Sequence, residues 1–471
     1  MAPVSRIPSE ILSLIPDFWD KHYYHRDRSL IALTHVCQAW REIFISRSSL
    51  WTDLDCMGED KTHVFLERSK SLPVNLSLHI KDGLPPCHPS TEIIPHAIGR
   101  AKSLSIQTAP EELQGITTHL SRHAPLLEKL SIHGSYYHET HPNPVLTPTL
   151  FNGDLSSLRV LELGSIRTEL PWRNMVNLTS FTLNHMSRGE PSIKQFLDFI
   201  ESAPRLRRIC LFCATPTSGA QNGRLVSLAC LERMEAICGG SASLLFDHLL
   251  IPVGAHLEIE VDLPSPPNQG PPPRFLDNLR NLPNFTDIHL HIDGRFPYMQ
   301  FSGPNGQVRM APRTSRVGRT YLGLESLSQF DTSKVERLRI DCHDSPSSDP
   351  PYRALLPMEH LRTLTLYYCR SPHIVIHALH PAMSSSGAMV CPKLEELVIV
   401  LDKETLDMKS VIGVVTARAL RGAKLRSVRI VGQNQPVQTD VLELEKHVLD
   451  VEYGPGVDRV YDDGDDSDDE D

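Results

Sequence analysis

A six-residue pattern, apolar-x-x-apolar-x-apolar, recurs along most of this chain and constrains its fold more than any other feature. Nine clear copies begin at Leu127, Leu158, Leu178, Leu206, Phe285, Val335, Leu361, Leu394 and Leu425. The last two apolar positions of each copy lie two residues apart, so their side chains fall on one face of a β-strand. Most copies begin 20 to 33 residues after the previous one. The pattern therefore predicts short strands, each with one buried face, joined by longer connections.

The recurring pattern resembles that of leucine-rich repeats, in which each unit adds one strand to a shared parallel sheet. Weaker copies around Leu76, Leu104 and Leu257 fit the same scheme, and the last falls inside the longest step, of 79 residues. Some units exceed the usual length of about 20–29 residues, which indicates an irregular array. We therefore expect an α/β fold in which residues 57–452 form an irregular leucine-rich-repeat-like solenoid with a parallel sheet. The alternative is a set of unrelated α/β units.

Three interruptions divide the array, and we expect insertion loops near 262–274, 295–320 and 343–351. The first and third are rich in proline, which favours loops and semi-rigid spacers. Within the second, residues 298–310 predict a hairpin around Pro304-Asn305-Gly306, because Asn-Gly favours tight turns. Insertions in repeat arrays often lie on the binding face, so these loops are candidates for partner contact.

Residues 1–56 have helical rather than strand spacing. Ser9 is suited to cap a helix that starts at Glu10, and Pro16 should kink or end this helix near Ile15. A second apolar stripe recurs every three or four residues, at Leu30, Leu33, Val36, Cys37 and Trp40. We expect a small all-α module with more apolar surface than it can bury by itself.

This segment resembles an F-box, the module that docks a protein onto the Skp-family adaptor of cullin-based ubiquitin ligases. The family pattern has a Leu-Pro-x-Glu-Leu-Leu-like start, a Leu-x-x-Val-Cys-x-x-Trp-Arg centre and a Leu-Trp end. The matching residues are Ile7, Pro8, Glu10, Ile11, Leu12, Leu33, Val36, Cys37, Trp40, Arg41, Leu50 and Trp51. The chain departs from the pattern at Ile7, where leucine is usual, and at Pro16, which interrupts the first helix.

The resemblance implies a substrate-recognition subunit of a Skp–cullin–F-box ubiquitin ligase. It assigns contact with the adaptor, or support for that contact, to Ile7, Pro8, Ile11, Leu12, Leu33, Val36, Trp40 and Trp51. The expected partners are the Skp-family adaptor, a cullin through it, and an unidentified protein substrate that the repeats bind. The alternative is a non-ligase interaction scaffold whose N-terminal helices only cap the first repeat, as terminal units of repeat arrays must.

Charge is concentrated at the C-terminus. Eight of the last ten residues are acidic, so the rest of the chain accounts for only −2 of the net charge of −10. We expect residues 453–471 to form an acidic disordered tail. The nearly neutral body lacks the basic face of a nucleic-acid-binding protein. Without an apolar run that could span a membrane or act as a signal peptide, we expect a cytoplasmic or nuclear location.

No motif assigns an enzymatic activity. Phosphate-binding glycine loops, nucleophile elbows and paired zinc-protease histidines are missing, and we expect neither catalytic residues nor a cofactor. One candidate partner-binding patch consists of Arg309, Arg313, Arg316 and Arg319. Guanidinium groups pair with phosphate through two hydrogen bonds, so such a patch suits an acidic or phosphorylated partner. The alternative is an exposed loop that meets the acidic tail.

Two further sets of residues have the composition of metal ligands. His289 and His291 share a strand face with Asp287 and Asp293, and two histidines with a carboxylate can bind a metal. Exposed residues on the open side of a sheet have the same pattern, and we predict no metal site. The ten cysteines are too scattered for a disulfide framework, and we expect the closest pair, Cys210 and Cys213, to be buried strand residues.

Overall fold

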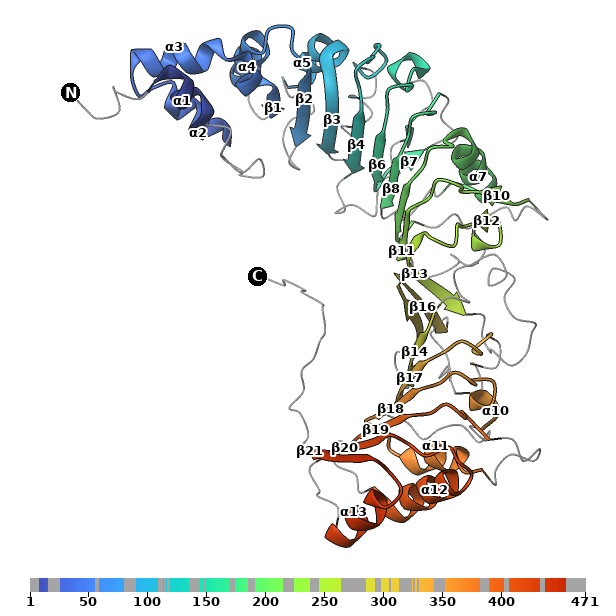
Figure 1. Cartoon of the computed structure of the whole chain (residues 1–471). Helices are drawn as coiled ribbons and strands as arrows, with labels where there is room; N and C mark the ends of the chain where they lie inside the picture. Colours follow the sequence, from blue (N-terminus) through green and yellow to red (C-terminus); the bar gives the residue numbers. More distant parts are fainter. Residues whose placement is uncertain are drawn as a thin grey trace. The chain divides into compact units, whose positions relative to one another are not determined.

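The computed structural model of the chain divides into two compact units, Met1–Leu231 and Glu232–Asp471. Figure 1 labels their helices and strands. The structure describes residues 8–15, 26–55, 59–79, 90–108, 113, 116, 119–134, 145–146, 150–168, 174–184, 191–214, 224–237, 245–263, 285–292, 298–304, 306–312, 324, 327, 330–342, 352–381, 389–401, 406–432 and 437–454.

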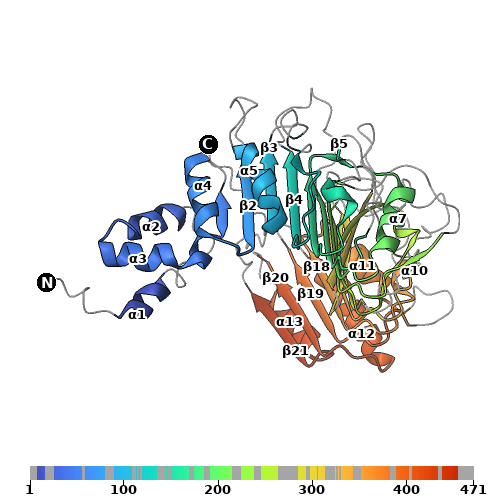
Figure 2. The ribbon, with the colours of Figure 1, turned by 90° about the horizontal axis from the view of Figure 1, so that it is seen from above.

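Unit 1 begins with α1 (Ser9–Leu14), α2 (Arg26–Leu33), α3 (Gln38–Ser46) and the short 3-10 helix η3 (Ser48–Trp51). Both α1 and α2 contact α3, and Figure 2 shows this helical module beside α4 (Glu59–Arg68). α1 starts at Ser9 with Pro8 at the N-cap position, one residue earlier than predicted. It ends at Leu14, as the proline at position 16 predicts.

The remainder of unit 1 is built on a parallel sheet. The described strands, in spatial order, are β1 (Asp53–Asp55), β2 (Val74–His79), β3 (Ala101–Thr108), β4 (Lys129–Gly134), β6 (Val160–Gly164), β8 (Ser180–Asn184) and β9 (Arg208–Phe212). The other elements are α5 (Ser90–Ala97), η4 (Ile98–Arg100), β5 (Val145–Leu146), η5 (Leu150–Gly153), β7 (Arg167–Thr168), α7 (Ile193–Ser202) and β10 (Val226–Ser227).

The repeating pattern sets the register of this sheet. Leu130 of β4 pairs with Leu161 of β6, which pairs with Phe181 of β8, and Phe181 pairs with Ile209 of β9. These four side chains are fully buried. A shift by one residue would turn every apolar side chain to the other face, so the apolar rows fix the pairing. The prediction of parallel strands at these copies is confirmed.

The strands of unit 2 are also mostly parallel to one another. Its described strands, in spatial order, are β11 (Arg233–Ile237), β13 (His256–Leu263), β16 (Gly306–Pro312), β15 (Tyr298–Gly303), β14 (Asp287–Ile292), β17 (Arg337–Cys342), β18 (Thr363–Tyr367), β19 (Glu396–Val400), β20 (Ser427–Val431) and β21 (Asp450–Gly454). The other elements are β12 (Leu249–Leu250), α10 (Tyr352–Leu355), α11 (Pro372–Ala378), α12 (Met408–Leu420) and α13 (Gln438–Glu445).

The hairpin predicted within residues 298–310 is confirmed, since β15 and β16 pair antiparallel across Gly303 and Gly306. We expected an insertion loop near 295–320. Its described residues instead form two strands of the sheet, β15 and β16. β15 pairs with β14, and β16 pairs in parallel with β13. The loop expected at 343–351, most of that at 262–274 and the tail beyond Gly454 lie outside the described residues. The expected boundaries at 56/57 and 452/453 stay predictions.

One face formed by the strands of unit 2 is apolar. Alternate side chains of β14, β17 and β18 are buried, and α10, α11 and α12 lie on one side of the strands β17–β20 (Figure 1). In these strands, the residues that alternate with the buried ones point to the opposite side of the sheet, because successive side chains of a strand point to opposite faces. We call that opposite side of β14–β18 the polar face. Among the described residues, no helix has the length and apolar character needed to cross a membrane.

Candidate functional site

The helical module leaves large apolar side chains in contact with solvent. Ile11 and Leu14 of α1 are 55% and 43% exposed, and Val36, between α2 and α3, is 56% exposed. Removing apolar area from water is favourable, by about 25 cal/mol per Å². These side chains are therefore candidates for contact with a partner protein, and we call the three residues together the module surface (Ile11, Leu14 and Val36).

The eight residues that the F-box resemblance singles out have different environments. Pro8, Ile11 and Val36 are exposed, and Leu33 and Trp40 are half-buried. Leu12 and Trp51 are buried, so these two side chains support the module from inside. Ile7 lies outside the described residues.

Trp51 joins the module to the first part of the sheet. Its indole N–H donates a hydrogen bond to the Phe44 carbonyl at 2.9 Å. Its ring meets the Phe65 ring of α4 edge-on at 4.8 Å between centroids, and the Arg68 guanidinium lies 4.4 Å from the ring centroid. A buried tryptophan thus satisfies its polar atom while its ring fills the space between η3 and α4.

The turn between α2 and α3 is fixed by hydrogen bonds. Arg41 donates from Nε to the Thr34 carbonyl at 2.9 Å, and the Thr34 hydroxyl donates to the Ile31 carbonyl at 2.7 Å. These bonds satisfy backbone carbonyls at the C-terminus of α2, which otherwise have no partner within the helix. They hold the segment that carries Val36 in one conformation.

Unit 1 also has a groove of about 780 Å³ at the edge of the sheet where the strands begin. Its basic lining residues are Lys102, Arg159, Arg205 and Arg207, and its one acidic lining residue is Glu128. Other lining residues are Pro73, Pro125, Leu126, Ser157, Asn177, Thr179 and Cys230. This rim groove therefore carries an excess of positive charge.

Hydrogen bonds between the segments that precede neighbouring strands build the rim groove. Asn177 donates from Nδ2 to the Ser156 carbonyl at 2.7 Å and accepts from Arg205 at 2.8 Å. Lys102 lies 3.7 Å from the carboxylate of Glu128. The Arg159 guanidinium is exposed and, within the described part of the chain, forms no ion pair. An acidic partner segment would meet a positive and partly unneutralised surface there.

Unit 2 concentrates polar and aromatic side chains on the polar face. The strand pairing places four residues of neighbouring strands opposite one another, so that they form one row across the sheet: Tyr298, His291, Asp341 and Tyr367. The neighbouring row contains Arg309, Gln300, His289, Arg339 and Thr365. Opposite side chains on adjacent strands lie within about 5 Å of each other at Cβ, so these rows form one cluster.

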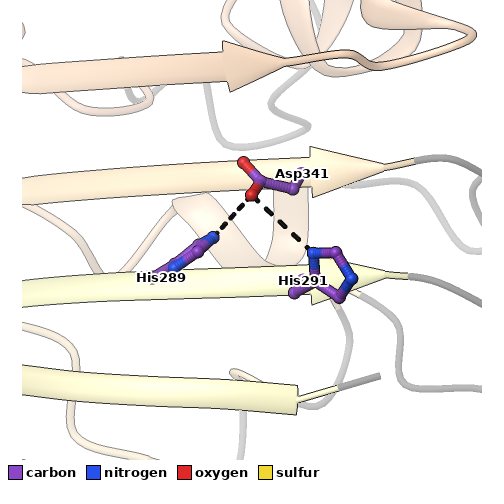
Figure 3. A group of neighbouring side chains, drawn as sticks. All are labelled: His289, His291 and Asp341. Carbon is purple, nitrogen blue, oxygen red and sulfur yellow. Dashed lines mark hydrogen bonds and ion pairs between the residues drawn. The ribbon is translucent and has the colours of Figure 1, made fainter. Parts of the chain in front are cut away.

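Asp341 is the centre of this cluster (Figure 3). Its Oδ2 lies 2.7 Å from His289 Nε2 and 3.7 Å from His291 Nδ1. Arg339 donates from Nε to Oδ1 at 2.9 Å and from Nη2 to Oδ2 at 3.1 Å. Burial alone would raise the pKa of Asp341, but the hydrogen bonds from His289, His291 and Arg339 outweigh it and hold the pKa well below its usual value. The carboxylate is therefore ionised at neutral pH.

Aromatic rings surround the two histidines. The Tyr298 ring stacks on His291 at 4.9 Å between centroids, and the Tyr298 hydroxyl lies 3.5 Å from Nδ1 of His289. The Arg309 guanidinium lies 4.1 Å from the Tyr298 centroid, and that of Arg339 lies 4.3 Å from the Tyr367 centroid. These contacts restrict both imidazole rings.

The structure confirms that Asp287, His289 and His291 share one face of β14. Asp287 forms an ion pair with Arg337 across β14 and β17, and Asp293 lies outside the described residues. The carboxylate that joins the histidines is Asp341, which sequence reasoning missed. Of the predicted arginine patch, Arg309 is exposed beside Tyr298, whereas Arg313, Arg316 and Arg319 lie outside the described residues.

The cysteine prediction is correct for one residue of the pair. Cys210 is buried in β9, whereas Cys213, which follows that strand with a positive φ, is exposed. Cys230, on the rim groove, is also exposed, and Cys369 and Cys391 of unit 2 are buried. Burial raises the pKa of both Cys369 and Cys391 to about 12, so these thiols stay protonated and unreactive at neutral pH.

No known protein family matches the chain, and no curated protein sequence matches it.

Proposed function

We propose that this chain is a substrate-recognition subunit of a Skp–cullin–F-box ubiquitin ligase. In this proposal the helical module binds the Skp-family adaptor, and the two sheet units, taken as an irregular leucine-rich-repeat-like solenoid, bind the substrate. The observation that carries the proposal is the module surface, where Ile11, Leu14 and Val36 keep 43% to 56% of their area exposed. Three large, exposed apolar side chains within one small helical module support a protein-binding role.

The residue pattern of the module supports the same proposal. The Val36-Cys37-x-x-Trp40-Arg41 segment spans the start of α3, and Arg41 fixes the turn that presents Val36. The motif residues with buried side chains, Leu12 and Trp51, stabilise the module, so the exposed ones are left for a partner. The regular register of apolar rows in both units supports the repeat assignment.

The test is co-purification with the Skp-family adaptor. Ile11→Asp combined with Val36→Asp places two charges on the module surface, and we expect recovery of the adaptor to fall at least tenfold. Val176→Asp is the matched control, because Val176 is also an exposed apolar residue of unit 1 (51%) but lies outside the module. Circular dichroism would check that all variants are folded. Equal recovery by wild type and the double variant would reject the proposal.

We propose that the positively charged rim groove is the part of unit 1 that contacts the substrate. Its excess of basic residues suits an acidic segment of the substrate. Affinity purification after proteasome inhibition, followed by quantitative mass spectrometry, would compare wild type with Arg159→Glu. We expect some bound proteins to be lost in this variant and kept in Lys194→Glu, which reverses an exposed charge on α7. An unchanged set of proteins would exclude the groove as a substrate site.

A second candidate function is a non-ligase scaffold in which the helical module only caps the sheet. The packing of Trp51 against Phe65 and Arg68 of α4 favours this alternative, since it makes the module continuous with the first strands. The co-purification experiment separates the two functions. A scaffold would fail to recover the adaptor even as the wild-type protein.

A further inference from the structure

We propose that His289, His291 and Asp341 bind a divalent transition-metal ion, and that Zn²⁺ is the ion this ligand set suits best. Two imidazoles and one carboxylate are a common protein ligand set for zinc. The proposal is independent of the ubiquitin-ligase function. It replaces the sequence-based expectation that this chain has no metal site.

The strands bring the three ligands together. A His-x-His segment in a strand directs both imidazoles to one face, and β14 has this arrangement at His289 and His291. The parallel pairing of β14 with β17 places Asp341 directly opposite His291. The ligands therefore project from two hydrogen-bonded strands rather than from loops, which gives a site precise geometry.

The distances between the ligand atoms are close to those of a zinc site. One nitrogen from each histidine and one oxygen of Asp341 all lie within 4.8 Å of one another. Ligand atoms about 2.0–2.1 Å from a tetrahedral zinc ion are about 3.3 Å apart, so the side chains need to move by only about 1 Å. Both histidines point at the same carboxylate oxygen (Figure 3), and an ion between the three groups would replace those contacts.

Neighbouring side chains orient the ligands. Arg339 donates to Oδ1 of Asp341 at 2.9 Å, and the Tyr298 hydroxyl lies beside Nδ1 of His289, the ring nitrogen that faces away from Asp341. Such outer contacts fix the tautomer and the orientation of metal-binding side chains. The positive charge of Arg339 opposes a bound cation, so we expect weaker affinity than that of a cysteine-rich zinc site.

The site leaves room for a fourth ligand. The side chains of His289 and His291 are 23% and 20% exposed, so the site reaches the surface of the polar face. Three protein ligands with an open position are typical of zinc sites that take water or a group from a partner.

The experiment is a titration of the full-length protein, freed of metal with a chelator and of any affinity tag, with ZnCl₂ in a calorimeter. We expect saturable binding of one Zn²⁺ that is weakened by more than about tenfold in His291→Gln and in His289→Gln. His79→Gln is the matched control and should bind as wild type does, because His79 is an exposed strand histidine that contacts Gln107 on another strand.

A second measurement uses Co²⁺ as a coloured substitute. Wild-type protein should show the visible absorption of a low-symmetry cobalt site, and His291→Gln should lose it while keeping the wild-type circular dichroism spectrum. The proposal is wrong if wild type takes up no more Zn²⁺ than His291→Gln, or if both histidine variants bind with wild-type affinity.

Discussion

The indole N–H of Trp51 donates to the backbone carbonyl of Phe44 at 2.9 Å, and both side chains are fully buried. This bond links the end of α3 to η3 at the point where the Trp51 ring packs on Phe65. Trp51 thus links the helical module to α4, and we expect the stability of the module to depend on this side chain.

We predict that Trp51→Phe lowers the free energy of unfolding of unit 1 by about 1–3 kcal/mol, because the Phe44 carbonyl loses its donor in a buried position. Trp51→Ala should cost about 3–5 kcal/mol, since it also leaves a cavity. Urea denaturation followed by circular dichroism would measure both. Trp40→Phe is the control, because Trp40 is only half-buried and should tolerate the change better. Equal losses for Trp40→Phe and Trp51→Phe would contradict the assignment of Trp51 as the anchor.

A buried arginine in α12 leads to the second prediction. Arg418 is fully buried, and it donates from Nη1 to the Val390 carbonyl and from Nη2 to the Cys391 carbonyl, both at 2.7 Å. Arg418→Ala removes both donors and leaves two carbonyls without them, so we expect unit 2 to lose about 3–5 kcal/mol.

The matched control for Arg418 lies in the same helix. Leu420 is 83% exposed, and Leu420→Ala should change stability by less than about 0.5 kcal/mol. Thermal unfolding of both variants is the measurement. A melting temperature of Arg418→Ala within a degree of wild type would show that the two hydrogen bonds do not stabilise the unit.

Strand positions could be predicted from the sequence because each copy of the pattern carries its own signal. The copies at Val335 and Leu361 became β17 and β18, with Leu338 opposite Leu364. β11 was missed because its copy, Leu231-x-x-Met234-x-Ala236, ends in alanine, which is a weak apolar marker. The three-residue strand β1 is too short to show any pattern.

The histidine cluster could be predicted only in part. The strand pattern predicts the shared face of His289 and His291, but the only carboxylates that it aligns with them are Asp287 and Asp293, which are close in sequence. The residue that joins the histidines, Asp341, is 50 residues beyond His291 and becomes its neighbour only through the pairing of β14 with β17. Aligning the copies at Phe285 and Val335 would have placed Asp341 level with His291.

The spacing of apolar residues does not predict which apolar side chains of the helical module are exposed. Leu12 and Ile11 are adjacent in the same helix, yet Leu12 is buried and Ile11 is exposed. Which of them faces a neighbour depends on how α1 packs on α3, and that packing is not encoded in the spacing of either helix alone.

The third prediction concerns the cap of α12. Asp407 accepts a hydrogen bond from the Ser410 hydroxyl and, at 3.2 Å, one from the Lys409 backbone N–H. These bonds lower the pKa of Asp407, chiefly through Ser410. A lowered pKa in the folded state means that the stabilisation is complete above the unfolded pKa of about 3.9 and is lost as the pH falls below it.

We therefore expect Asp407→Ala to destabilise unit 2 by about 1 kcal/mol at pH 7, and the difference from wild type to shrink between pH 4 and pH 2.5. Thermal melts across this range would measure it. Asp407→Asn should keep most of the stability at pH 7, since asparagine also caps helices. A difference between wild type and Asp407→Ala that stays constant down to pH 2.5 would show that the carboxylate does not cap α12.

The last prediction separates the buried thiols from the exposed ones. Burial raises the pKa of Cys369 and of Cys391 to about 12, and the Cys369 thiol donates to the Ile340 carbonyl at 3.4 Å. Iodoacetamide reacts with the thiolate, so both should stay unmodified in folded protein at pH 8, whereas the exposed Cys37, Cys213 and Cys230 should react.

Since the folded-state pKa of these two thiols is raised, their contribution to stability is present below the unfolded pKa of about 8.5 and is lost as the pH rises toward 12. Cys369→Ala and Cys391→Ala should therefore flatten the fall in stability of unit 2 between pH 8.5 and pH 11. Peptide mass spectrometry after timed alkylation, with a urea-unfolded sample as the positive control, gives the reactivity directly. Modification of Cys391 at the rate of Cys213 in folded protein would mean that the segment held by Arg418 opens far more readily than its burial indicates.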